Sequence, residues 1–111
     1  MLKVEYNDPD LTLRDRPTNW GGGVYLYKGQ PFNGVEIYHY EGTRQLSAEY
    51  EYKEGIFDGR QLKYWRNGNL KEEFFRKFDY YVGSFKRWDE DGQLISHQEF
   101  DEFGNWIETI L

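Results

Sequence analysis

Residues 55–75 read Gly55-Ile-Phe-Asp-Gly-Arg-Gln-Leu-Lys-Tyr-Trp-Arg-Asn-Gly68 and continue as Asn69-Leu-Lys-Glu-Glu-Phe-Phe75. Glycines and an Asn-Gly pair separate two segments that are rich in aromatic and aliphatic side chains. The Asn67-Gly68 dipeptide is favoured in two-residue hairpin loops, because both central residues of such a loop need positive φ. The stretch therefore predicts a turn, a strand, a tight turn and a second strand.

Weaker copies of this stretch lie on both sides of it. Two sets of glycines recur every 24 to 26 residues: Gly34, Gly59 and Gly83 in one set, and Gly42, Gly68 and Gly92 in the other. Each glycine of the second set precedes a segment with a leucine, a glutamate and an aromatic residue: Leu46, Glu49 and Tyr50; Leu70, Glu73 and Phe74; Leu94, Glu99 and Phe100. Such a period is typical of a repeat array.

The pattern of apolar residues favours strands throughout. In residues 44–52, Leu46, Ala48, Tyr50 and Tyr52 alternate with polar residues, and no window sustains a helical period. We expect an all-β fold, an antiparallel meander of repeated β-hairpins with about seven or eight strands in an elongated, twisted sheet. At 111 residues the chain predicts a single domain, with an N-terminal cap at 1–23 and three hairpin repeats at 24–111.

The repeat resembles a known one. The order of glycine, Tyr or Trp, Asn-Gly or Asp-Gly, leucine, glutamate and aromatic residue is similar to the MORN-variant repeat of the YwqK-like bacterial antitoxin family. The residues that carry the resemblance are Gly59, Tyr64, Trp65, Asn67, Gly68, Leu70, Glu73 and Phe74, and less closely Gly83, Trp88, Asp91, Gly92, Leu94, Glu99 and Phe100. The resemblance implies stacked hairpins and a role as antitoxin or immunity protein, and it supplies no catalytic residue.

Composition narrows the classes of function. The net charge of -6 disfavours nucleic acid and anionic membranes as partners, and favours a basic protein. With no cysteine, disulfides and thiol chemistry are excluded. The sequence has no apolar run of signal-peptide length or membrane-spanning length, which favours a cytoplasmic protein.

Candidate catalytic, cofactor and metal residues are absent from the pattern. His39 and His97 lack the spacing of paired metal ligands, and neither accompanies a marked nucleophile. The recurring Glu49, Glu73 and Glu99 favour pairing with Lys or Arg on neighbouring strands rather than a catalytic carboxylate pair. The aromatic residues favour packing along the sheet, with a protein-binding patch as the alternative.

Charge is unevenly distributed along the chain. Residues 54–88 carry eight Lys or Arg and five Asp or Glu, whereas residues 89–111 carry seven acids and no Lys or Arg. The acidic end could simply be a solvated edge that discourages strand pairing between molecules. Alternatively it docks on a basic cleft, with nearby rings at the centre of the interface. The residues predicted to bind the partner are Trp88, Asp89, Glu90, Asp91, Glu99, Asp101, Glu102, Phe103 and Trp106, with Phe100 a further nearby ring.

The sequence thus predicts a non-enzymatic immunity protein or antitoxin without a cofactor. Its partner would be a cognate protein toxin with a basic active-site cleft, such as a nuclease or a nucleotide-using enzyme. The alternative hypothesis is a MORN-type scaffold that mediates protein–protein or membrane-surface interaction.

Overall fold

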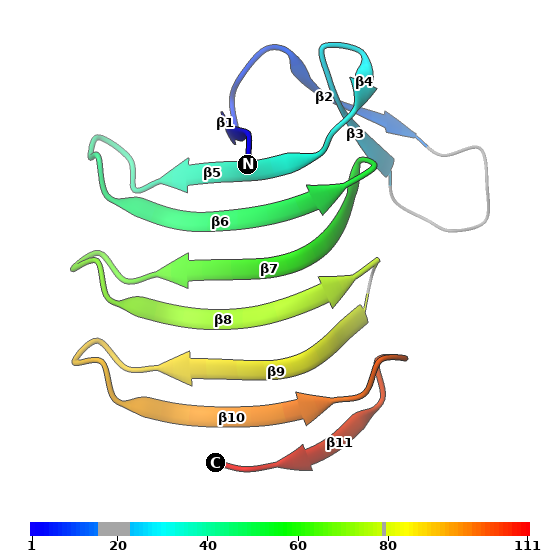
Figure 1. Cartoon of the computed structure of the whole chain (residues 1–111). Coiled ribbons are helices and arrows are strands. Elements are labelled where there is room, and N and C mark those ends of the chain that lie inside the picture. The colour runs from blue at the N-terminus through cyan, green and yellow to red at the C-terminus, as the bar shows by residue number, and fades with distance from the viewer. Residues whose placement is uncertain (16–22, 79) are drawn as a thin grey trace.

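The computed structural model describes residues 1–15, 23–78 and 80–111, which form eleven strands and no helix (Figure 1). The predicted all-β class is confirmed. The strands are β1 (Lys3–Glu5), β2 (Leu11–Asp15), β3 (Gly23–Tyr27), β4 (Gln30–Pro31), β5 (Gly34–His39), β6 (Leu46–Lys53), β7 (Ile56–Tyr64), β8 (Leu70–Lys77), β9 (Tyr80–Trp88), β10 (Leu94–Phe100) and β11 (Trp106–Thr109).

The strands form one large and one small sheet. The large sheet has the order β1-β5-β6-β7-β8-β9-β10-β11, and each strand from β5 onward pairs antiparallel with the next. The pairing of β1 with β5 is parallel, which differs from the purely antiparallel sheet expected. The small sheet has the order β2-β3-β4. The hairpins of the large sheet therefore start at Gly34, whereas residues 23–31 belong with β2 in the small sheet.

The hairpin turns differ from the predicted type. Two backbone hydrogen bonds close the β7–β8 turn. The Gly68 N–H donates to the Trp65 carbonyl, and the Trp65 N–H donates to the Asn69 carbonyl. Only Gly68 has positive φ there, so Asn67-Gly68 is part of a three-residue loop and not of a two-residue one. Asp91-Gly92 in the β9–β10 turn follows the same pattern.

Two-residue loops occur elsewhere. Lys28 and Gly29 have φ of 51° and 81° between β3 and β4, and Glu54 and Gly55 have φ of 52° and 79° between β6 and β7. Both pairs have the two positive φ values that the mirror-image hairpin turn requires.

Gly59 and Gly83 lie inside strands β7 and β9, where the register with the neighbouring strand shifts. Both have positive φ, which is the backbone role expected for the repeat glycines. The fully buried Gln61 side chain supports the first bulge, because its Nε2 donates to the carbonyls of Glu51 and Gly59. The spacing of these glycines thus reflects one bulge in the β6–β7 pair and one in the β8–β9 pair.

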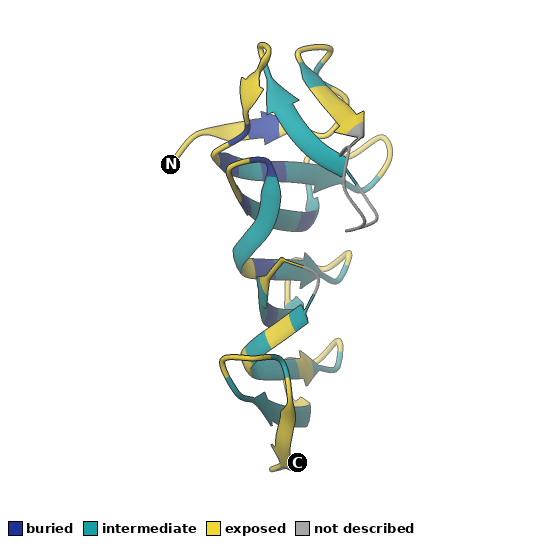
Figure 2. Cartoon of the chain, turned by 90° about the vertical axis from the view of Figure 1, so that its right-hand side faces the viewer, coloured by how far each residue is buried: buried dark blue, intermediate teal, exposed yellow. Residues whose placement is uncertain are grey.

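The core lies at one end of the molecule. Val4, Phe32 and Tyr52 form its centre, where the small sheet packs against the large one. Tyr25 of β3 joins the sheets, since its N–H donates to the Gly55 carbonyl and its ring meets the Tyr52 ring edge-on. No described residue after Phe74 is buried, and Figure 2 shows the burial fading toward the C-terminus.

Beyond the core the large sheet is a single layer held by side-chain ladders. Phe74 and Phe85 on neighbouring strands stack with ring centroids 4.8 Å apart, and Tyr81 meets both rings edge-on. Phe100 extends the ladder to β10 by packing on Tyr81. Aromatic rings suit such a sheet because they bury area on one side while their edges stay near water.

Candidate functional site

The acidic segment predicted to bind a partner occupies the last turn of β9–β10, strand β10 and strand β11. These strands are at the end of the sheet farthest from the small sheet (Figure 1). Strand β10 spans seven residues, so its two ends lie roughly 20 Å apart at the usual rise of a strand. This length decides which of the predicted residues can act together.

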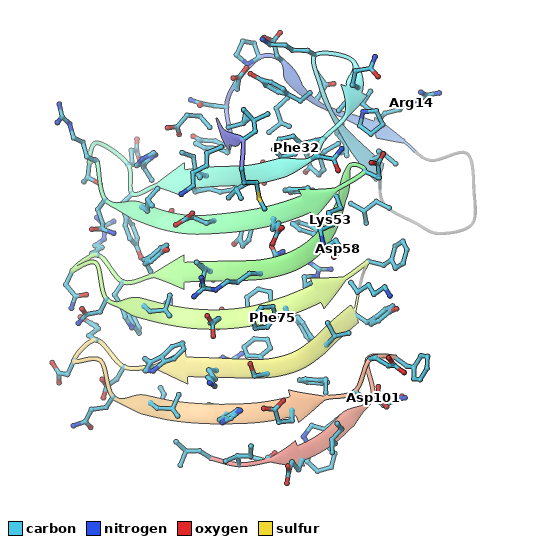
Figure 3. All side chains as sticks on the ribbon, in the orientation of Figure 1. Arg14, Phe32, Lys53, Asp58, Phe75 and Asp101 are labelled. Atoms are coloured by element: carbon cyan, nitrogen blue, oxygen red, sulfur yellow. The ribbon has the colours of Figure 1, made fainter. Side chains whose placement is uncertain are left out.

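The structure divides the predicted residues into two groups. Trp88, Asp89, Glu90 and Asp91 lie at the β9–β10 turn, on the left of Figure 1. Asp101, Glu102, Phe103 and Trp106 lie at the β10–β11 turn on the right, and Asp101 is labelled there in Figure 3. Glu99 belongs with the second group because it is next to the end of β10. The predicted residues therefore do not form one continuous patch.

The first group makes contacts within the molecule through two backbone carbonyls and the Asp89 side chain. Trp65 donates its indole N–H to the Trp88 carbonyl over 3.1 Å, and the amides of Asn67 and Asn69 both donate to the Glu90 carbonyl over 2.8 Å. Asp89 accepts the backbone N–H groups of its own turn. An equivalent bond runs from the Tyr40 hydroxyl to the Tyr64 carbonyl, so the turns on this side are stacked by a repeated contact.

Asp101 has a comparable structural role at the opposite turn. Its Oδ1 accepts the backbone N–H groups of Phe103 and Asn105, each over 2.9 Å. The hydrogen bond from the Asn105 backbone is the main cause that holds the pKa of the Asp101 carboxyl below its ordinary value. Asp101 thus shapes the loop that presents Glu102 and Phe103.

Large apolar side chains are exposed around this loop and along β11. Phe103 is 73% exposed and Trp106 is 58% exposed. Three further exposed residues are Ile107, Ile110 and Leu111, and Figure 2 shows all of β11 exposed. The sequence does not mark these three residues, because the alternation over residues 106–111 is too short to define a face. Exposed rings and aliphatic side chains grouped in this way are typical of an interaction site.

The acids of β10 and β11 differ from the acids in the interior of the sheet in the groups that they face. Glu72 lies between Lys63 at 3.4 Å and Arg87 at 3.0 Å, and Glu73 lies 2.6 Å from Arg60. In contrast, Glu99 stands opposite Glu108 in the β10–β11 register, and its carboxylate meets His97 at 2.7 Å.

The three recurring glutamates also differ in the groups that they contact. Glu73 pairs with Arg60 on the neighbouring strand, which confirms the expected pairing for one of the three, whereas Glu49 pairs at 3.2 Å with Lys3 of β1, which is separated from β6 by β5. Glu49 also accepts the Tyr64 hydroxyl, and burial together with this bond raises the pKa of Tyr64 to about 12. Glu99 meets a histidine instead of a Lys or Arg.

Other candidate groups serve the fold. His39 lies 3.2 Å from Glu5, and the described residues contain no group of side chains that could hold a metal ion. Glu36 is a buried carboxylate that accepts the Tyr52 hydroxyl over 2.8 Å, and burial raises its pKa. The part of the chain that the structure describes has no helix able to span a membrane.

The comparisons with known proteins give no relative: no family model, no curated protein and no solved structure matches the chain.

Proposed function

We propose that the chain is a cytoplasmic, non-enzymatic immunity protein or antitoxin that binds one cognate protein toxin and blocks its basic active-site cleft. One observation carries the proposal. Exposed apolar side chains gather at β11 and the loop before it, within a segment that carries seven acids and no Lys or Arg. The resemblance of the repeats to the antitoxin family supports the same proposal.

The chemistry of this edge suits a basic cleft. Enzymes that cut nucleic acid or use nucleotides hold phosphate with Lys and Arg, and carboxylates of a protein can pair with the same groups. Opposite charge also speeds the encounter and rejects wrong partners. The rings of Phe103 and Trp106 would supply the desolvated centre that an interface needs for affinity.

The proposed footprint is smaller at one end and larger at the other than the sequence suggests. It keeps Glu99, Glu102, Phe103 and Trp106, adds Glu108 and the neighbouring apolar residues Ile107, Ile110 and Leu111, and assigns Asp101 to shaping the loop. It leaves out residues 88–91, where the Trp88 and Glu90 carbonyls and the Asp89 side chain hold the turns together at the far end of β10.

Co-expression tests the proposal directly. The product of the gene adjacent to that of this chain is expressed in a heterologous host with and without the chain, and growth and co-purification are measured. We expect the chain to relieve growth arrest and to co-purify with the product at micromolar concentration. Absence of both effects would contradict the proposal.

A pair of matched variants tests the footprint. Glu102→Lys with Glu108→Lys should slow association and abolish protection, whereas Glu90→Lys with Asp91→Lys changes the charge equally at the far turn and should preserve protection. Both variants leave Asp89 and Asp101, which hold the turns, in place. Binding of the unmodified chain to anionic vesicles in a flotation assay would favour the scaffold hypothesis instead.

A further inference from the structure

The face of the large sheet that carries the aromatic ladder also carries cations. Residues opposite each other on neighbouring strands share a face, and the register sets Phe74 opposite Phe85 and Arg76 opposite Tyr81. Side chains two residues apart on a strand share a face as well. On β7–β10, the aromatic and charged side chains of this aromatic face are Phe57, Lys63, Glu72, Phe74, Arg76, Tyr81, Phe85, Arg87 and Phe100.

The aromatic face has more positive than negative charge. Glu72 is the one carboxylate that strands β7–β10 place on it, and this carboxylate already serves two cations, Lys63 at 3.4 Å and Arg87 at 3.0 Å. Arg76 is the third cation. Three cations and one carboxylate leave an excess of positive charge on this face, although the whole chain has a net charge of -6.

Arg76 lacks a counter-ion. Its side chain is only partly exposed, and the central carbon of its guanidinium lies 4.4 Å from the centre of the Phe57 ring. Its Nε is enclosed and has no hydrogen-bond acceptor among the described residues. An aromatic ring offsets only part of the cost of removing a cation from water. Arg60 and Arg87, in contrast, each meet a carboxylate.

The surroundings of Arg76 are open. The described residues place no second layer over β8–β10, and Figure 2 shows a single sheet below the small one. Tyr81, which stands opposite Arg76, is 41% exposed, and the rings of Phe85 and Phe100 contact it. Arginine and tyrosine are enriched at the centres of protein interfaces, where a ring supplies apolar area and a guanidinium supplies directed hydrogen bonds.

We infer that the aromatic face binds an acidic segment of a partner protein, with an Asp or Glu paired to the terminal amino groups of Arg76 and an apolar side chain against Tyr81. Charge complementarity selects this occupant, because a carboxylate matches a guanidinium in shape and charge. A long polyanion such as nucleic acid would be repelled by the acidic chain as a whole. The inference goes beyond the proposed function, whose footprint is at β11, so either can fail without the other.

Defined probes test the site. The acidic probe is a short synthetic peptide of leucine and aspartate, the neutral probe replaces each aspartate by asparagine, and the third probe is inorganic phosphate. NMR follows the backbone amides and the Arg76 Nε–H, which is observable because it is enclosed. We expect the acidic probe to shift the Arg76 Nε–H and the Tyr81 amide. The neutral probe should bind at least about tenfold more weakly, and phosphate should leave Tyr81 unchanged.

Matched variants separate binding at Arg76 from general attraction. Arg76→Gln should weaken binding of the acidic probe about tenfold or more, since a hydrogen bond between charged groups is lost. Lys77→Gln removes the same charge at the next residue, which is exposed on the opposite face, and should have little effect. Arg76→Lys keeps the charge without the planar fork and should weaken binding less than Arg76→Gln, which provides a second comparison if Arg76→Gln does not fold.

Equal binding of the neutral probe, or equal loss in the Arg76→Gln and Lys77→Gln proteins, would overturn the inference. Phosphate that produces the same shifts as the acidic peptide would also overturn it, in favour of a site for small anions. Shifts of the β8 and β9 amides that depend on protein concentration without any peptide would replace the partner by a second copy of the chain.

Discussion

Replacing Gly59 by alanine should destabilise the protein far more than the same change at Gly83. Both glycines lie at register shifts, but their surroundings differ. At Gly59, φ is +106° and an added Cβ would stand 2.2 Å from Glu51 Oε1. At Gly83, φ is +70° and no atom lies within 4 Å of the added Cβ. The pair therefore separates backbone strain from steric conflict.

The magnitudes follow from these differences. A left-handed backbone costs a residue with a Cβ about 1–2 kcal/mol, so Gly83→Ala should cost about 1 kcal/mol. Gly59→Ala should be at the upper end of that range, because its φ lies beyond the left-handed well. It must also displace the Glu51 carboxylate, which accepts the Arg60 N–H over 3.0 Å. Losing that bond adds about 1 kcal/mol, for a total of about 3 kcal/mol.

Urea unfolding followed by far-UV circular dichroism measures the difference, with equal m-values as the check that both variants unfold from the same structure. A gap of about 2 kcal/mol between the variants corresponds to about 8 °C in Tm for a domain of this size. If Gly59→Ala is no less stable than Gly83→Ala, the position of Glu51 against the bulge does not matter and the reasoning is wrong.

Three further changes test other parts of the structure. Burial raises the pKa of Glu36, so the folded state favours the protonated carboxyl, and the wild-type protein loses stability as pH rises through the folded pKa. Glu36→Gln should therefore be more stable than wild type in urea at pH 7, with the advantage vanishing near pH 4. A stability difference that does not change with pH would contradict this. Trp65→Phe removes the bond to the neighbouring turn and should cost about 1 kcal/mol in the same assay, whereas Trp106→Phe should cost nothing measurable. Asp101→Ala should speed amide exchange in the β10–β11 turn, and equal exchange in a Glu102→Ala control would show that Asp101 does not shape the loop.

Much of the fold could be predicted because it depends on local signals. The glycine spacing and the alternation around Ala48 indicated strands and a repeat, and the structure has strands at these places. The loop type could not be derived from Asn67-Gly68. The same dipeptide fits a three-residue loop in which only the glycine is left-handed, and the choice depends on how the flanking strands align. The small sheet was also missed, because the boundary predicted at residue 23 assigned β2 to the cap and residues 24–31 to the repeats, although β2, β3 and β4 pair with one another.

The candidate site was predicted less well for a geometric reason. Residues that are close in sequence were assumed to be close in space, but β10 separates Trp88 from Trp106 by the length of a strand. Composition showed the excess of acids after residue 88. It could not show that Asp101 serves its own turn, or that Glu99 and Glu108 are opposite each other, because both facts depend on the register.

The placement of the buried core at one end affects how the sequence can change. In a sheet whose hairpins contact mainly their neighbours, stability is approximately a sum of local terms, and an altered terminal strand disturbs little beyond the strand beside it. Substitutions in β11 therefore leave Val4, Phe32 and Tyr52 untouched. Such a molecule can acquire a new partner by changing its last hairpin while the opposite end continues to secure the fold.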